Sequence, residues 1–130
     1  MKFLSRYEAN AYFLLRIIFG FLFTCHGVQK LFGLPYLFPP DQTVFTAHFP
    51  SLVWFSAIIE LITGVLIFLG FFTRCAAFIA SGEMAVGYFM AHARGGFFPI
   101  RNHGELAVIY CFVALYIACR GAGRFGIDRA

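Results

Sequence analysis

Four stretches of the sequence are apolar over about the length that an α-helix needs to cross a lipid bilayer, roughly 20 residues. They cover residues 11–32, 52–72, 75–93 and 105–119. Inside a bilayer the backbone polar groups must be satisfied within the spanning segment, and a helix achieves this. The sequence therefore predicts an all-α membrane protein, in which residues 1–130 form a single domain, an antiparallel bundle of four transmembrane helices.

The composition fits a protein that has lipid as part of its solvent. Hydrophobic residues make up 61% of the 130 residues and charged residues 12%, against roughly 45–50% and 25% in soluble domains. A soluble domain of this size has too little interior to bury so many large apolar side chains. The net charge of +4 comes from basic residues that form no run, so we expect no nucleic-acid partner.

The basic residues near the ends of the apolar stretches and between them predict the orientation, because loops rich in lysine and arginine stay in the cytoplasm. With four spans, one side of the membrane receives three of these residues and the other side six. The three are Lys30, Arg94 and Arg101, and the six are Lys2, Arg6, Arg74, Arg120, Arg124 and Arg129. We therefore expect a multi-pass protein of the cell (inner, cytoplasmic) membrane with both termini in the cytoplasm.

The connections between the spans differ in length. Thr73 and Arg74 form a tight turn, which makes the second and third helices antiparallel neighbours. In the long connection over residues 33–51, Asp41 is placed to cap a short interfacial helix over residues 42–49. Residues 94–104 are rich in glycine and predict a structured loop at the membrane surface.

Small residues and cysteines within the spans are interpreted as structural. Ala77, Ser81 and Ala85 repeat every four residues, a pattern that lets membrane helices approach closely, so the third helix is expected to be the central packing helix. The four cysteines form no C-x-x-C pair, and no metal-ligand spacing or nucleophile–base pair is present. We expect neither a metal site nor independent catalysis.

Ionisable side chains inside the spans are the strongest functional signal, because each costs at least about 2.5–3.5 kcal/mol at the centre of a membrane helix. Seven ionisable groups, inside the spans or close to their outer ends, fall in the outer half of the predicted bundle and come from all four helices: His26, Lys30, Glu60, Glu83, His92, His103 and Glu105. The candidate binding or proton-relay residues are His26, Lys30, Glu60, Glu83, His92, Asn102 and Glu105.

Three interpretations of this cluster remain open. The first is an internal network in which Lys30 and the histidines neutralise the carboxylates. The second is a pocket for a polar head group, such as that of a quinone, or a proton relay. The third is haem held between His26 and His92, which we expect to be uncommon for histidines beside carboxylates.

The charged residues of the cytoplasmic half have structural or partner-binding interpretations. Arg16 is expected to extend toward the cytoplasmic surface and to orient the first helix. The others are Arg74, Arg120, Arg124 and Asp128, three of which belong to a C-terminal tail that could recruit a soluble partner.

An ordered set of motifs resembles the DoxX family of small membrane proteins over nearly the whole chain. It comprises HGVQKLFG at 26–33, ELITG at 60–64, GFFTR at 70–74, His92 followed by GGFF at 95–98, NHGE at 102–105 and GAGRFGID at 121–128. Two positions depart from the family pattern, His103 in place of a glycine and Gly126 in place of a serine.

The resemblance implies four helices and an association with membrane redox systems that use quinol, thiosulfate or thiols. We therefore expect an accessory or quinone-interacting subunit of a membrane redox complex, with other oxidoreductase subunits or further copies of the chain as protein partners. Two alternatives stay open: a carrier for a small solute or for protons, and a non-catalytic membrane scaffold.

Overall fold

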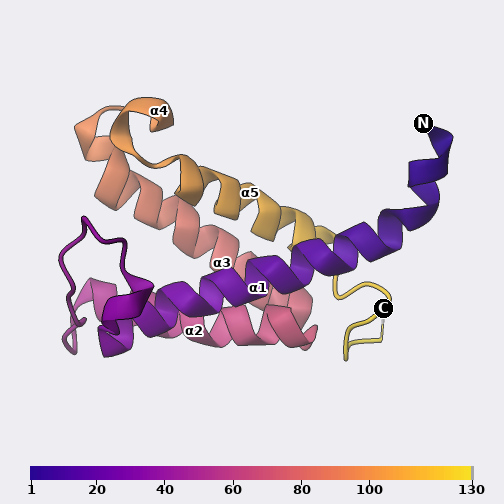
Figure 1. The fold of residues 1–130 in the computed structure, drawn as a ribbon, viewed down its shortest axis with the longest axis horizontal. Coiled ribbons are helices and arrows are strands. Elements are labelled where there is room, and N and C mark those ends of the chain that lie inside the picture. Colours follow the sequence, from indigo (N-terminus) through magenta and orange to yellow (C-terminus); the bar gives the residue numbers. More distant parts are fainter. Residues whose placement is uncertain (130) are drawn as a thin grey trace.

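The computed structural model describes residues 1–129, and in these residues the chain is helical without any strand. The four long helices are α1 (Glu8–Phe32), α2 (Leu52–Leu69), α3 (Thr73–Gly87) and α5 (Glu105–Arg120). Of these, α1 and α2 run close to the long axis of the molecule, and α3 and α5 run obliquely to them (Figure 1). The expected helices at 11–32, 52–72, 75–93 and 105–119 are thus present, with shifted ends.

Shorter elements complete the chain. A 3-10 helix (Lys2–Tyr7) leads into α1, and another (Pro35–Leu37) follows it. A π-turn, η3 (Tyr88–His92), and a 3-10 turn (Ala93–Gly95) continue α3, and α4 (Pro99–Asn102) is a single turn before α5. The third predicted helix is therefore not one regular helix to residue 93.

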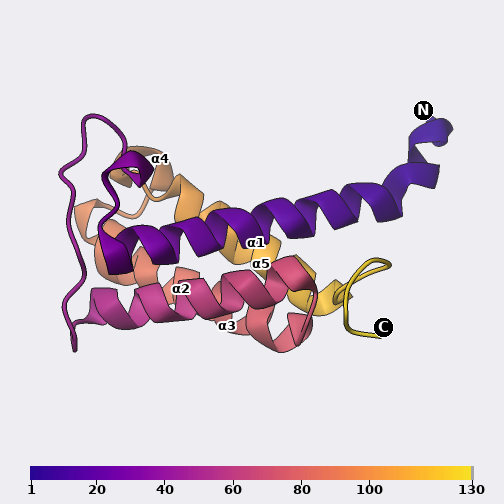
Figure 2. The ribbon, with the colours of Figure 1, turned by 60° about the horizontal axis from the view of Figure 1, so that its bottom comes forward.

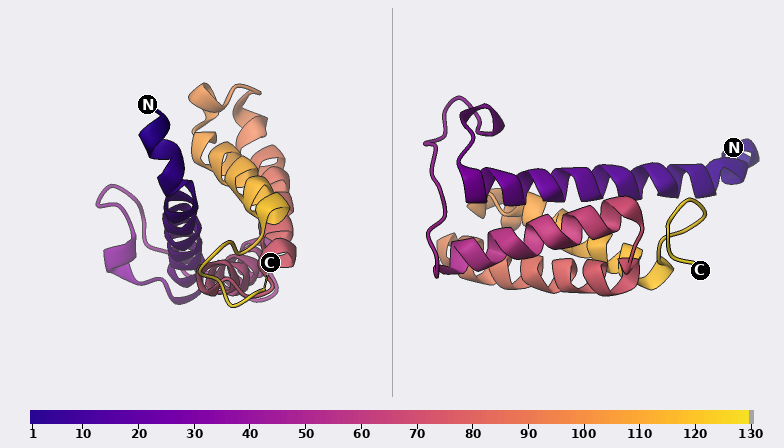
Figure 3. Two further views of the ribbon diagram at one scale, coloured as in Figure 1. Left: turned by 90° about the vertical axis from the view of Figure 1, so that its right-hand side faces the viewer. Right: turned by 90° about the horizontal axis from the view of Figure 1, so that it is seen from below.

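The helices form two close pairs, α1 with α2 and α3 with α5, and α2 packs on α3 to join them (Figures 2 and 3). The N-terminal part of α1 projects beyond the other helices, and both chain ends lie at the same end of the bundle (Figure 1). Two helical segments, Lys2–Phe32 and Leu52–Leu69, are long and apolar enough to cross a membrane by themselves.

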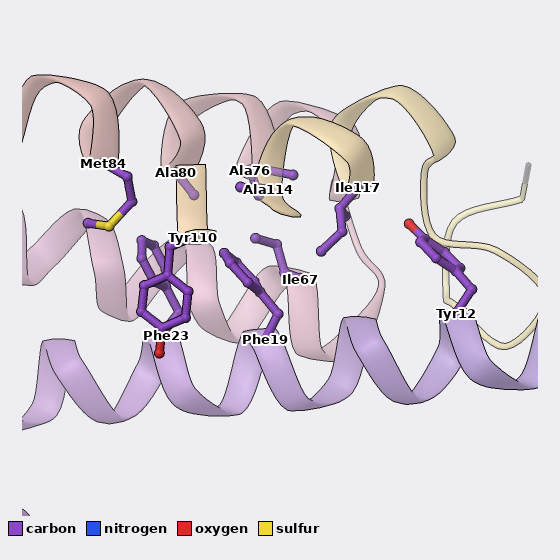
Figure 4. Packing of buried hydrophobic residues seen from close by; sticks show 11 residues of the cluster. Tyr12, Phe19, Phe23, Ile67, Ala76, Ala80, Met84, Tyr110, Ala114 and Ile117 are labelled. Carbon is purple, nitrogen blue, oxygen red and sulfur yellow. The ribbon is translucent and has the colours of Figure 1, made fainter. Parts of the chain in front are cut away.

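A layer of apolar side chains fills the space between the pairs (Figure 4). Phe19 and Phe23 of α1 both contact the ring of Tyr110 on α5 edge-on, with ring centroids 5.4 and 5.8 Å away. The small-residue face of α3 packs against α5, where the Ser81 hydroxyl donates to the carbonyl of Cys111 at 2.8 Å. The stripe of small residues is thus a packing surface, as expected.

The glycines that allow backbone contact between helices lie elsewhere, between α1 and α2. A Cβ at Gly27 would lie 2.6 Å from the nitrogen of Leu61, and a Cβ at Gly64 would lie 2.6 Å from the nitrogen of Thr24. The glycines of α1 that face α2, Gly20 and Gly27, are seven residues apart. This spacing of seven residues differs from the spacing of four that identifies the small-residue stripe of α3.

Large apolar side chains cover the outward faces of the helices. Ile18 and Phe21 of α1, Phe78 of α3 and Phe112 of α5 are each more than half exposed. Soluble monomers rarely expose apolar patches this extensive. Lipid is the solvent that suits such a surface.

The loop over residues 33–51 corrects one prediction, because residues 42–49 form no helix. The segment instead folds back over the end of α1, where the backbone N–H of Ala47 donates to the carbonyl of Lys30 at 2.7 Å. The Gln29 amide donates to the carbonyl of Leu37 at 2.7 Å. These bonds satisfy carbonyls that a helix end leaves free, and they require an extended chain.

The turn between α2 and α3 also differs from the prediction. Gly70 ends α2 in the left-handed conformation, with φ 70°, and Thr73 and Arg74 already belong to α3. The early start of α3 has a physical cause, because the Asp128 carboxylate accepts hydrogen bonds from the backbone N–H groups of Phe72 and Thr73 at 2.9 and 2.8 Å.

Candidate functional site

A polar cavity of about 220 Å³ lies at the end of the bundle where α1 ends and α5 begins. Its walls come from α1, α2, α3, η3 and α5, so it requires the whole fold. Apolar walls are provided by Met84, Leu106 and Ala107, and the polar or ionisable lining residues are His26, Lys30, Glu60, His92, His103 and Tyr110. The structure thus brings four of the predicted site residues to one cavity.

The strongest interaction in this polar cavity is an ion pair between α1 and α2. The Lys30 ammonium lies 2.8 Å from Oε1 of Glu60, and the Glu60 residue is only 2% exposed. The second carboxylate oxygen of Glu60, Oε2, is buried and has no hydrogen-bond partner among the described residues. A buried oxygen of this kind is an acceptor that a bound group can satisfy.

Glu83 lies beside the polar cavity and does not line it. The hydroxyl of Ser56 donates to Oε1 of Glu83 at 2.6 Å, and the Lys30 ammonium donates to Oγ of Ser56 at 3.3 Å. Glu83 is therefore joined to the Lys30–Glu60 pair through a serine that the sequence analysis missed. Ser56 precedes Glu60 by one helical turn and so shares its face, which is the signal that could have identified it.

The histidines of the polar cavity are held mainly by aromatic contacts. The His26 ring meets the Tyr110 ring edge-on, with centroids 5.7 Å apart. The His92 ring stacks on Tyr88 at 6.3 Å, and its Nδ1 lies 3.2 Å from the carbonyl oxygen of Asn102. Tyr110 is a lining residue that the sequence did not distinguish from the other tyrosines of the chain.

Two predicted site residues have other positions. Asn102 shapes the loop, since its amide donates to the Tyr88 hydroxyl at 3.1 Å and to the Gly96 carbonyl at 2.7 Å, while its Oδ1 accepts from the N–H of Gly104 at 2.8 Å. Glu105 is exposed at the start of α5 and does not line the polar cavity. Sequence position gave the depth of these two residues but not the direction of their side chains, and a binding role for either stays a prediction.

At the opposite end of the bundle, charged side chains close helix ends. The prediction that Arg16 reaches the surface is wrong: the residue is 1% exposed, and its guanidinium donates to the carbonyls of Ile67 and Phe68, at 2.7 and 2.9 Å. These carbonyls belong to the last turn of α2, where a positive charge also meets the negative end of the helix dipole. The Arg16 guanidinium also donates to the carbonyl of Phe125 at 3.4 Å and so connects the C-terminal tail to the end of α2.

Arg74 acts similarly at the end of α5, whereas Arg120 forms an ion pair with another helix. The Arg74 guanidinium donates to the carbonyls of Ala118 (3.2 Å), Cys119 and Arg120 (3.1 Å). Arg120 pairs with Glu8 at the start of α1. Arg124 is exposed and lies over the ring of Phe125. Of the tail's charged residues, therefore, Arg120 and Asp128 are engaged within the chain itself.

The described residues contain no group of three or more His, Cys, Asp or Glu side chains arranged to hold a metal ion. They offer instead hydrogen-bond donors that line the polar cavity and, on the lining residue Glu60, an unsatisfied acceptor. Such a set can bind a small polar group that has both carbonyl and hydroxyl character.

Comparison with known proteins adds the family. Residues 11–93 match the DoxX family. An uncharacterized protein of Haemophilus influenzae is 37% identical over 131 residues, which cover 98% of this chain and 96% of that protein. No solved structure matches the chain. The motifs at residues 26–33, 60–64 and 70–74 all lie within the matched region, and the chain belongs to the DoxX family of membrane proteins.

Proposed function

We propose that this protein is an accessory, quinone-interacting subunit of a membrane redox complex and that its polar cavity binds the quinone head group. The observation that carries the proposal is Oε2 of Glu60, a buried acceptor without a partner among the described residues that belongs to a residue lining the polar cavity. The electron-transferring centres would belong to partner subunits.

The lining residues match the two forms of a quinone. Lys30, His26 and His92 carry N–H groups that can donate to the carbonyl oxygens of the oxidised form. The free oxygen of Glu60 can accept a hydrogen bond, or a proton, from a hydroxyl of the reduced form. Tyr110 and the apolar wall of Met84 and Leu106 suit the flat ring.

The arrangement of the helices favours entry of the quinone from the lipid. The polar cavity is lined from α1 on one side and α5 on the other, and the backbones of these two helices approach each other less closely than each approaches its own partner, α2 or α3. Their separation is filled by aromatic side chains such as Phe23 and Tyr110, and an isoprenoid tail could pass between such side chains from the lipid.

The membrane arrangement is part of the same proposal. We propose that α1, α2, α3 with η3, and α5 cross the cell membrane as one domain of residues 1–130, with both termini in the cytoplasm. The shared location of the chain ends and the exposed apolar faces support an even number of crossings.

The other candidate functions have less support. A carrier needs a polar path through the bundle, but Phe19 and Phe23, which lie between Arg16 and His26 along α1, are buried in the apolar core. The scaffold would use Arg120, Arg124 and Asp128, and of these Arg120 and Asp128 already bond within the chain, which leaves Arg124. Haem between His26 and His92 is not favoured, because the His26 ring packs against Tyr110 and the His92 ring against Tyr88.

Lipid extraction and mass spectrometry of the purified protein test the proposal. We expect quinone to co-purify with the native chain and with Glu105→Gln, and to be lost from Glu60→Gln. Glu105 is the matched control, because it is an exposed glutamate at the same end of the bundle. Equal quinone content in the two variants, with both folded, would contradict the proposal.

A further inference from the structure

Two acids of different helices, the buried Glu60 and the half-buried Glu83, are joined through one lysine and one serine. The Lys30 ammonium donates to Oε1 of Glu60 at 2.8 Å and to Oγ of Ser56 at 3.3 Å. The Ser56 hydroxyl in turn donates to Oε1 of Glu83 at 2.6 Å. We call Glu60 and Glu83 the acid pair, and Lys30 and Ser56 its bridge.

The charges of the acid pair and its bridge do not balance if both acids are ionised, because one ammonium faces two carboxylates. The other titratable groups around them are three histidines and one tyrosine: His26 of α1, His92 of η3, His103 before α5 and Tyr110 of α5. None of these donates to either carboxylate within the described part of the chain. At a pH well above the ordinary histidine range they add no positive charge.

An isolated ionised carboxylate in an apolar environment is so costly that it takes up a proton instead. Glu60 has the direct ion pair with Lys30, whereas Glu83 has only the neutral hydroxyl of Ser56. Oε2 of Glu83 is also buried without a partner among the described residues. We propose that Glu60 and Glu83 share one exchangeable proton, which rests on Glu83 and moves between the two acids through Ser56 and Lys30.

The transfer balances in three linked steps. When a proton reaches Glu60 while Glu83 is ionised, Ser56 gives its hydroxyl proton to Oε1 of Glu83. Lys30 replaces the Ser56 proton, and Glu60 replaces the Lys30 proton. The result is an ionised Glu60, a charged Lys30 and a protonated Glu83, so the net charge of the group is unchanged.

The shared proton deepens the proposed function, because it gives the quinone cavity an internal acceptor for a proton. Only this purpose rests on quinone binding; the shared proton itself does not. The proton itself can be counted without quinone. If the protein holds no shared proton, the proposal that it binds quinone is unaffected. If the protein binds no quinone, the number of protons on Glu60 and Glu83 is unaffected.

Infrared spectroscopy of the ligand-free protein in lipid measures the count, since a protonated carboxyl absorbs apart from a carboxylate. The other four acids, Glu8, Asp41, Glu105 and Asp128, lie in exposed or tail positions. We expect the native protein and Glu105→Gln to show the same protonated-carboxyl band. We expect both Glu60→Gln and Glu83→Gln to lose it, because each leaves one carboxylate for one lysine.

Lys30→Met gives the opposite result, because both acids are then without a cation and the band should about double in area. If that variant does not fold, the two glutamine variants still decide. A native protein without a band that these variants remove would overturn the inference, and so would a band that survives in either variant.

Ser56→Ala tests the route. The proton count should not change, but the band should shift in frequency, because Glu83 loses its donor, and its exchange with deuterium should slow. Unchanged exchange would show that the proton reaches Glu83 by another path and would overturn the transfer through Ser56. Circular dichroism confirms that each variant keeps its helices.

Discussion

Gly20 of α1 and Phe68 of α2 are in backbone contact: a Cβ at Gly20 would lie 2.5 Å from the backbone nitrogen of Phe68. The same Cβ would lie 2.8 Å from the carbonyl oxygen of Gly64. Backbone atoms of two packed helices cannot yield to such a contact. The α1–α2 pair that carries Lys30 and Glu60 therefore depends on glycine at this position.

Gly20→Ala should destabilise the protein by about 1–3 kcal/mol, as overpacking does in well-packed cores. Gly82→Ala is the matched control, because a Cβ there meets nothing within 4 Å and alanine favours a helix by up to about 1 kcal/mol. Thermal unfolding in detergent, followed by circular dichroism, should move in opposite directions for the two variants. Equal midpoints would contradict the close α1–α2 packing.

Arg16→Met should also destabilise the bundle. The substitution keeps an apolar stem but removes the donors to Ile67 and Phe68, and hydrogen bonds from a charged group contribute about 1.5–3 kcal/mol. Arg6→Met, at an exposed position ahead of α1, is the control and should be near neutral. If Arg16 instead reached the surface, the two variants would unfold alike.

Asp128 gives a prediction of pH dependence. Burial acts to raise the pKa of this carboxyl, but hydrogen bonds from the backbone N–H groups of Thr73 and Phe72 outweigh it and hold the pKa below its ordinary value of 3.8. A lowered pKa in the folded state means that the ionised form stabilises the fold. This contribution is fully present above pH 3.8 and is lost as the pH falls through the folded pKa.

Asp128→Ala should accordingly lower the stability at neutral pH by about 0.5–2 kcal/mol, the usual effect of removing a helix N-cap. The difference from the native protein should stay constant down to about the ordinary pKa and shrink below it. Unfolding midpoints over a pH series check this, with Asp41→Ala in the exposed loop as the control. A difference that is unchanged in acid would show that the carboxylate charge is not what caps α3.

The sequence predicted the number and approximate position of the long helices, because apolar length is a direct signal of a span. It also predicted that His26, Lys30, Glu60 and His92 converge, since their depths along the helices agree. It could not give the direction of each side chain. Glu105 was included for its depth alone, although it lies on the exposed side of α5.

The roles of Arg16, Arg74 and Asp128 could not be predicted for a related reason. Each bonds to backbone groups at the end of a helix that is distant in the sequence. Backbone carbonyls and N–H groups are the same at every residue, so the sequence holds no mark of which helix end a charge will meet. These contacts become visible only in the folded chain, where Phe125 and Asp128 of the tail lie against the end of α2 and the start of α3.

Four crossings with cytoplasmic termini predict the behaviour of reporter fusions. Alkaline phosphatase, which is active only outside the cytoplasm, should be active when joined after Asp41 or Arg101 and inactive when joined after Arg74 or Arg129. A fluorescent protein that folds in the cytoplasm should give the reverse pattern. Activity of alkaline phosphatase after Arg129 would contradict the orientation, and equal activity after Asp41 and Arg74 would contradict the crossing by α2.

The central claim is that the polar cavity binds a quinone head group through Glu60. Calorimetric titration of the protein in lipid nanodiscs with a short-chain quinol tests it most directly. We expect the native chain and Glu105→Gln to bind with the same Kd and Glu60→Gln to bind at least about tenfold more weakly, because a hydrogen bond to a charged group contributes about 1.5–3 kcal/mol. One Kd shared by all three proteins, or no binding to the native chain, would contradict the claim.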